Sequence, residues 1–163
     1  MVFFVIELAT RKVEIVGIHE DPCEDQMMQW ARNLTDAQDG FLKDKRILIH
    51  DRDPLFTKKF RETLGAAGVR ALKLPKRAPN LNPYAERFVL AIKSECLDKM
   101  ILVGEKHVRY VIEQYVSHFL TEKPHRVLGR RIIEPETPMP TEGEVLCRER
   151  LGGLLKTYYR KAA

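Results

Sequence analysis

The sequence predicts a mixed α/β fold in which strands and helices alternate along the chain. Short runs of β-branched and aromatic residues indicate buried strands, and apolar stripes at three- and four-residue spacing indicate helices between them. Polar, glycine and proline clusters mark the joints. The 163 residues are enough for one domain with a real core. The expected order β-β-α-β-α-β-α-α gives a mixed sheet flanked by helices, its first pair antiparallel and its later strands parallel.

The first half of the chain carries most of the expected strands. Residues 2–8 and 12–19 are apolar enough for two strands joined by a hairpin turn. Residues 24–36 place Met27 and Trp30 on a helical stripe, which predicts core packing. The next expected elements are a strand over 46–50, a helix over 54–66 that Asp53 caps, and a strand over 69–74.

The second half of the chain is predicted to be mainly helical. Asn82-Pro83 repeats the signal of a cap followed by proline and predicts a helix over 83–98. A second helix over 104–121 follows from an apolar face at helical spacing. Three prolines and a glycine predict an extended linker over 132–143. We expect the basic tail, 144–163, to be partly helical and broken at Gly152-Gly153.

Composition limits the classes of protein that fit. Lys and Arg number 28 against 23 Asp and Glu, so the net charge of +5 permits a polyanionic partner without requiring one. The cysteines Cys23, Cys96 and Cys147 lie far apart, which argues against a zinc site or a disulfide framework and predicts a reducing cytoplasm, with all three buried or inert. No apolar run approaches the roughly 20 residues of a membrane span.

Asp51 stands at a favourable place for chemistry. It follows the apolar run Ile47-Leu48-Ile49 and precedes an expected helix. Open α/β sheets bind their ligands at the carboxyl ends of strands. Asp51 is therefore a candidate metal ligand, although a turn or capping residue is the alternative. Asp53 is better explained as a helix cap.

Four segments resemble the catalytic core of insertion-sequence transposases and retroviral-type integrases, the DDE group with a ribonuclease H-like fold. They are Phe3-Phe4-Val5-Ile6-Glu7-Leu8-Ala9-Thr10-Arg11, His50-Asp51-Arg52-Asp53-Pro54-Leu55-Phe56, Asn82-Pro83-Tyr84-Ala85-Glu86-Arg87-Phe88 with Lys93 and Glu95, and Glu122-Lys123-Pro124-His125-Arg126-Val127-Leu128-Gly129. Between Asp51 and Glu86 lie 34 residues, close to the spacing that is typical of this group.

The resemblance implies DNA integration or transposition by two-metal phosphoryl transfer, with Mg²⁺ or Mn²⁺ as the cofactor. Asp51 and Glu86 would be the catalytic, metal-binding carboxylates, since hard divalent cations prefer oxygen ligands. DNA would be the partner, and the protein would be cytoplasmic and associated with the nucleoid when bound to DNA. The expected DNA contacts are Lys73, Lys76, Arg77, Arg87, Lys93, His125 and Arg126.

The resemblance also implies a missing part. The family's first catalytic Asp lies on a strand that would precede residue 1, and Glu7 matches an acidic position of the second strand instead. We therefore expect an amino-terminally incomplete catalytic core over 1–131, followed by a linker and basic tail over 132–163. Alone it should have little or no strand-transfer activity. An upstream fragment, or a homo-oligomer, are the expected protein partners.

Simpler interpretations remain open for several residues. Glu86 taken alone is a helix-surface acid, Glu95 a solvated one, and His50 either a substrate contact or a hydrogen-bonded structural residue. Single basic residues, including the tail group with Arg148 and Arg150, are solvated charges by default. The alternative function is an inactive DNA-binding or oligomerising remnant of a transposase. A ribonuclease H-like nuclease of another kind is a third, less favoured hypothesis.

Overall fold

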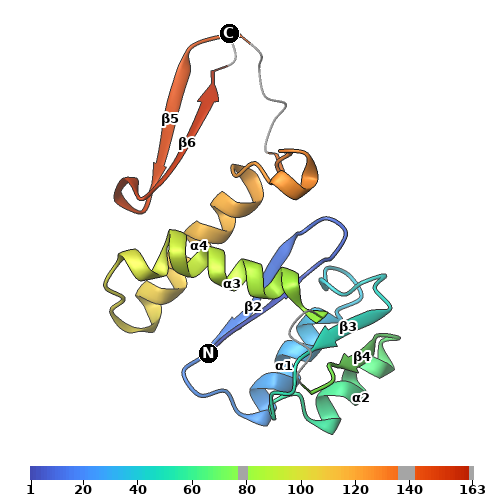
Figure 1. Cartoon of the computed structure of the whole chain (residues 1–163). Coiled ribbons are helices and arrows are strands. Elements are labelled where there is room, and N and C mark those ends of the chain that lie inside the picture. Colours follow the sequence, from blue (N-terminus) through green and yellow to red (C-terminus); the bar gives the residue numbers. More distant parts are fainter. Residues whose placement is uncertain (77–80, 136–141, 162–163) are drawn as a thin grey trace. The chain divides into compact units, whose positions relative to one another are not determined.

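The computed structural model describes residues 1–76, 81–135 and 142–161 of the chain. The chain forms two compact units. The first contains residues 1–5 and 14–85, and the second contains residues 6–13 and 86–163. Figure 1 shows strands and helices alternating along the sequence, so the predicted mixed α/β character is confirmed.

The chain opens with the predicted hairpin of β1 (Val2–Ile6) and β2 (Val13–Ile18). The Glu7 amide donates to the Lys12 carbonyl at 2.9 Å near the turn, and the His19 amide donates to the Met1 carbonyl at 3.1 Å at the open end. Arg11 adopts a φ of 69° between them, a left-handed conformation that reverses the chain. Both bonds fit antiparallel pairing.

A strand-helix-strand crossover follows in the first unit of the structure, with β3 (Ile47–His50) and β4 (Arg70–Lys73) joined through α2 (Lys58–Ala66). The two strands are parallel, with Ile47 opposite Arg70 and His50 opposite Lys73. The predicted parallel connection is therefore confirmed. Because the strands are parallel and α2 returns between them, the start of α2 lies at the carboxyl end of β3 and β4.

The predicted start of this helix at Pro54 is wrong. Helix α2 begins at Lys58, where the hydroxyl of Thr57 accepts a hydrogen bond from the Phe60 amide at 3.3 Å. Asp53 instead caps a turn, because its carboxylate accepts from the Leu55 amide at 2.9 Å. Asx turns use the same side-chain chemistry as helix caps, so the local signal suited both.

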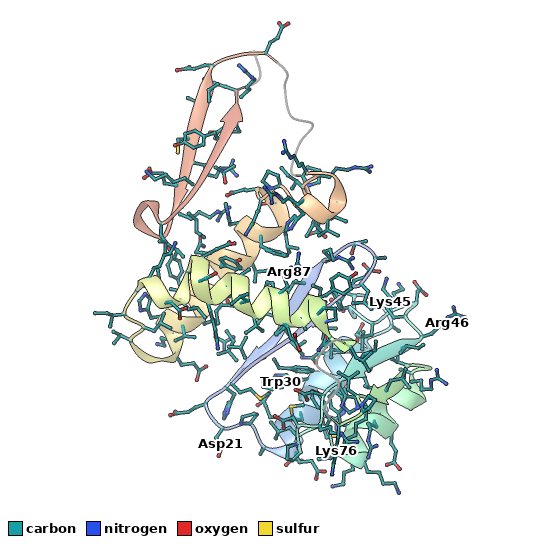
Figure 2. All side chains as sticks on the ribbon, in the orientation of Figure 1. Asp21, Trp30, Lys45, Arg46, Lys76 and Arg87 are labelled. Atoms are coloured by element: carbon teal, nitrogen blue, oxygen red, sulfur yellow. The ribbon has the colours of Figure 1, made fainter. Side chains whose placement is uncertain are left out.

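Helix α1 (Glu24–Leu34) supplies much of the core of this unit. Its predicted stripe is confirmed, since Met27 is 0% exposed and Trp30, labelled in Figure 2, is 5% exposed. A Cβ at Gly17 of β2 would lie 2.1 Å from the Trp30 ring. Glycine is thus the residue that lets the indole pack against β2. The core also includes Phe3, Val5, Leu34, Leu42, Leu48, Phe60, Leu64 and Val69.

The described strands form three separate two-stranded sheets, β1–β2, β3–β4 and β5–β6. The single continuous mixed sheet that the sequence predicted is absent from the part of the chain described. Strands β1 and β3 nevertheless share one hydrophobic core, through Phe3 and Leu48. Apolar burial is non-directional and needs no pairing between strands, so the core can form while β3 keeps β4 as its hydrogen-bonded neighbour within the described chain.

The second unit is built on α3 (Pro83–Glu95) and α4 (Gly104–Thr121), connected through a short 3₁₀ turn, η2 (Leu97–Lys99). Both helices were predicted, although the first ends three residues earlier than expected. The rings of Phe88, Tyr115 and Phe119 pack together, with Phe88 edge-on to Phe119 at 5.2 Å between centroids. Such aromatic contacts join the two helices.

The tail is a β-hairpin, so the prediction of partial helix is wrong. Strands β5 (Val145–Arg150) and β6 (Leu155–Arg160) pair antiparallel around a turn, η4 (Leu151–Gly153). Gly152 and Gly153 have φ values of 66° and 88°, which favour glycine and reverse the chain there. Alternate residues of both strands are more buried, the period of a strand with one covered face.

The three cysteines differ in their exposure to solvent. All three cysteines are free, but Cys23 and Cys147 are exposed, and Cys96 is the buried one. Burial therefore holds for Cys96 alone, and the expectation that the exposed Cys23 and Cys147 are inert stays a prediction. In the described parts of the chain, no helix is both long and apolar enough to cross a membrane.

Candidate active site

Asp51 follows the last residue of β3 directly, at the carboxyl end of the strand as predicted. Its carboxylate accepts a hydrogen bond from the Asp53 amide at 3.0 Å, which forms a tight turn and orients the side chain. The neighbouring Arg52 donates through Nε to the Leu74 carbonyl at 3.0 Å, just beyond β4. These bonds fix an exposed carboxylate at the end of a parallel strand pair.

His50 is buried beside Asp51, with 4% of its surface exposed. Its Nδ1 lies 2.7 Å from the Asp51 carbonyl oxygen. A carbonyl only accepts, so Nδ1 carries the proton and holds the backbone of Asp51. Burial, together with the charges of Arg61 and Lys73, lowers the pKa of His50, and its ring packs on Phe56 at 4.6 Å. His50 is therefore a hydrogen-bonded structural residue.

Glu86 lies in the first turn of α3 and is exposed. Lys93 lies seven residues later on the same exposed face, since seven residues are about two helical turns. The opposite face of α3 buries Phe88 and Ile92. The helix thus presents a carboxylate and an ammonium to solvent while its apolar face holds the core of the second unit.

The two candidate carboxylates belong to different units, Asp51 to the first and Glu86 to the second. Over the described residues, no group of three His, Cys, Asp or Glu side chains is arranged to hold a metal ion. Their oxygen donors fit Mg²⁺ or Mn²⁺ in chemistry. Two carboxylates fall short of the three that the resemblance implies.

The predicted DNA contacts are distributed over both units. Lys73 and Lys76 are exposed in the first unit, and Arg87, Lys93 and Arg126 are exposed in the second. Figure 2 labels Lys76 and Arg87. Arg77 lies outside the described residues. The exposed cations are all placed where a polyanion could reach them.

His125 is placed differently from the other predicted contacts. Its Nε2 lies 2.8 Å from the Phe119 carbonyl oxygen, and its ring meets the Phe119 ring edge-on at 4.5 Å. Burial lowers the pKa of His125. The residue precedes a 3₁₀ turn, η3 (Arg126–Leu128), and anchors this turn to the end of α4. A contact between His125 and DNA stays a prediction.

Glu95 is not the solvated residue that the sequence suggested. It accepts a hydrogen bond from the Tyr115 hydroxyl at 3.0 Å and forms an ion pair with Lys123. Burial and the neighbouring Glu95 carboxylate raise the pKa of Tyr115 above its usual range. This polar contact joins the end of α3 to α4 and to the segment after it.

The sequence did not indicate the role of a further carboxylate, that of Glu122. Glu122 is 5% exposed and accepts hydrogen bonds from Arg150 Nη2 at 2.7 Å and Arg148 Nη1 at 3.2 Å. His118 Nδ1 at 2.9 Å and Thr157 Oγ1 at 3.1 Å contact its other oxygen. Arg148 and Arg150 are therefore paired, not solvated. No local pattern links positions so far apart in sequence, apart from the four-residue step between His118 and Glu122.

Comparison with known proteins supports the resemblance over part of the chain. No curated protein and no solved structure matches the sequence. Residues 67–132, less than half of the chain, match the family model described as the integrase core domain. This stretch contains β4, α3 and α4, Glu86 and all the predicted DNA contacts, while Asp51 precedes it. The match supports an integrase- or transposase-type catalytic core in this chain.

Proposed function

We propose that the chain is a ribonuclease H-like, DDE-type catalytic core that acts on DNA in integration or transposition. The observation that carries this proposal is the match of residues 67–132 to the integrase core domain. The position of Asp51 after β3, at the ligand-binding end of a parallel strand pair, adds independent support. A net charge of +5 suits a DNA partner in a cytoplasmic, nucleoid-associated protein.

Asp51 and Glu86 would hold Mg²⁺ or Mn²⁺, and the lysines and arginines would bind phosphates. A bound divalent ion supplies an activated oxygen nucleophile and stabilises the leaving oxygen in phosphoryl transfer. The Asx turn orients the Asp51 side chain, and Glu86 stands in the first turn of α3. Lys93 would contact the DNA backbone as a point charge on the same face as Glu86.

We propose that a further polypeptide segment supplies the first Asp. Strand β3 pairs with β4, and no other described strand pairs with its second edge, which is where a strand from another segment would add. Addition of a strand to an open edge is a recurrent mode of peptide recognition. An upstream fragment or a second copy in a homo-oligomer could provide such a strand.

Isothermal titration with Mn²⁺ tests the metal ligands. The wild-type chain should bind Mn²⁺, and Asp51→Asn or Glu86→Gln should lose the heat of binding because each removes an anionic oxygen ligand. Asp98→Asn removes an exposed carboxylate from η2 and serves as the matched control. Equal binding by Asp51→Asn and the control would exclude Asp51 as a ligand.

The alternative function is an inactive DNA-binding or oligomerising remnant. It is favoured by the lack of a three-acid group among the described residues. A strand-transfer assay with Mg²⁺ and a labelled DNA end separates the two functions when a segment bearing the first Asp is added in trans. Joining that depends on Glu86 supports the catalytic core, whereas DNA binding without joining supports the remnant.

A further inference from the structure

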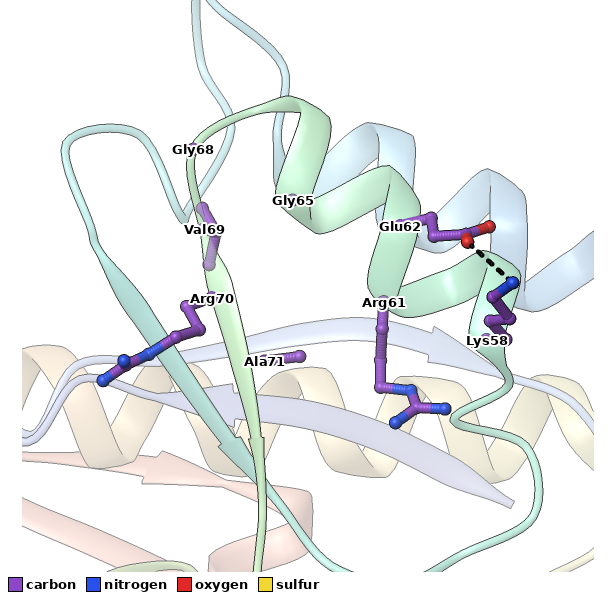
Figure 3. A pocket seen from close by; sticks show the side chains of 8 residues that line it. All are labelled: Lys58, Arg61, Glu62, Gly65, Gly68, Val69, Arg70 and Ala71. Atoms are coloured by element: carbon purple, nitrogen blue, oxygen red, sulfur yellow. Dashed lines mark ion pairs between the residues drawn. The ribbon is translucent and has the colours of Figure 1, made fainter.

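A shallow, open hollow lies between α2 and β4 in the first unit (Figure 3). Three cationic residues line it, Lys58 and Arg61 from α2 and Arg70 from β4. Figure 3 shows the Arg70 side chain extending on the side of β4 away from α2, so that Arg61 and Arg70 lie on either side of this strand. Glu62 is the one acidic side chain among the residues lining it. The lining therefore carries an excess of two positive charges, at positions that the sequence did not single out.

The positive charge of the hollow is available to a ligand. Lys58 and Glu62 form an ion pair at 3.4 Å, but their side chains are 84% and 62% exposed, so water screens the pair strongly. Arg61 donates through Nε to the Thr57 carbonyl at 3.3 Å, which leaves its terminal nitrogens for other partners. Over the described residues, neither Arg61 nor Arg70 forms an ion pair with a carboxylate.

The floor of the hollow admits a close approach. A Cβ built on Gly65 or on Gly68 would meet nothing within 4 Å, and Ala71 is the small side chain beside them. The hollow offers no aromatic ring or large exposed aliphatic side chain, since Val69 is 2% exposed. Protein partners usually anchor through such apolar pockets. Phosphate groups require only cations and polar donors, so the lining favours nucleic acid over an acidic peptide.

The hollow reaches toward the end of the strands where Asp51 lies. Lys58 and Arg61 belong to the start of α2, at the carboxyl end of the parallel pair, whereas Arg70 begins β4 at the other end. The cations thus extend along the α2–β4 surface away from the candidate carboxylate.

We propose that this hollow, through Arg61 and Arg70, binds the phosphate backbone of a DNA duplex outside the predicted set of DNA contacts. The inference rests on the proposed function for the choice of DNA as the partner. The hollow is then a second DNA-binding surface, separate from the candidate carboxylates. Binding there is independent of base sequence, because phosphate contacts carry no direct sequence information.

Fluorescence anisotropy of a labelled DNA duplex against the full chain, between about 50 and 200 mM salt, tests the hollow. Arg61→Gln/Arg70→Gln should weaken binding by roughly tenfold or more and reduce the slope of log K against log salt by about 1.8, or about 0.9 per phosphate contact. Arg61→Lys/Arg70→Lys keeps both charges and should retain most of the slope. Arg32→Gln/Lys43→Gln removes two exposed cations elsewhere in the first unit and should leave the slope nearly unchanged.

The outcomes separate the two proposals. If the wild-type chain binds no duplex, both the hollow and the proposed function fail. If the wild type binds but the Arg61→Gln/Arg70→Gln slope equals that of the control, the hollow alone is overturned. Circular dichroism verifies that each variant is folded. Binding of poly-glutamate, with the same dependence on the arginines and without duplex binding, would identify a protein-docking surface and overturn the assignment to DNA.

Discussion

Among individual side chains, Glu122 connects α4 with both strands of the tail hairpin in the second unit. Its carboxylate accepts hydrogen bonds from two arginines and a threonine of the tail hairpin, and it pairs with a histidine of α4. Burial alone would raise the pKa of its carboxyl, but the bonds from Arg150, His118 and Arg148 outweigh it and lower the pKa to about 2. Charged hydrogen bonds can offset desolvation when every oxygen is engaged.

The stability of this cluster should depend on pH. The pKa of Glu122 lies near 2 in the folded chain, below its ordinary value of 4.5, so the folded state favours the carboxylate. The ionised carboxylate therefore contributes about 3 kcal/mol to the free energy of unfolding. This contribution is fully present above about pH 5 and is lost as the pH falls toward 2. Urea unfolding across this range should show the loss. Glu122→Gln should flatten the pH dependence, whereas Glu113→Gln, an exposed position on α4, should follow the wild type.

Gly17 offers a prediction about packing. Gly17→Ala forces a methyl group into the Trp30 ring and should lower the free energy of unfolding by about 1–3 kcal/mol, because overpacking shifts neighbouring groups. Gly65→Ala is the matched control. Nothing lies within 4 Å of its Cβ position in α2, so it should stabilise by up to about 1 kcal/mol. Equal unfolding midpoints for the two variants would contradict this account.

The helix α2 illustrates how one element acquires its boundary. Asp53-Pro54 and Thr57 are both good local starts, and the helix uses Thr57. Asp53 and Asp51 instead make consecutive turns that carry the chain away from β3. The choice between these starts depends on where Phe60 and Leu64 must lie to be buried, which is a property of the packed unit.

Thr57→Ala should destabilise the first unit by about 1 kcal/mol, because the Phe60 amide loses its capping acceptor. Chemical denaturation monitored by Trp30 fluorescence measures the change. Thr57→Ser keeps the hydroxyl and should lie within a few tenths of a kcal/mol of the wild type. A full loss in the serine variant would attribute the effect to the methyl group and not to the cap.

For the chain as a whole, surface charge should govern DNA binding. Arg87→Gln/Lys93→Gln removes two exposed cations from α3 and should lower the salt slope of duplex binding by about 1.8. Lys99→Gln/Lys106→Gln removes two exposed cations of the same unit that were not predicted to contact DNA. Anisotropy titrations measure the salt slope of duplex binding for both double variants. An equal decrease of the slope in both would indicate diffuse attraction without localised contacts.

Local sequence pattern was sufficient for most elements and for the position of Asp51. The stripe with Met27 and Trp30, the parallel connection into β4 and the two long helices follow from periodicity and turn residues. The match to the integrase core domain bears out the resemblance in part. Periodicity is a property of neighbouring residues, so it can be read without knowing the packing.

Long-range contacts decided the rest. The tail became a hairpin because its alternating residues could cover one face and Arg148 and Arg150 could reach Glu122. The hollow arose because the crossover brought α2, which carries Arg61, alongside β4, which begins at Arg70, and no spacing along the chain specifies this. Phe3 and Leu48 share one core although their strands lie in separate sheets, because apolar burial requires no pairing between strands. Such contacts depend on which distant surfaces meet, and only the tertiary structure determines this.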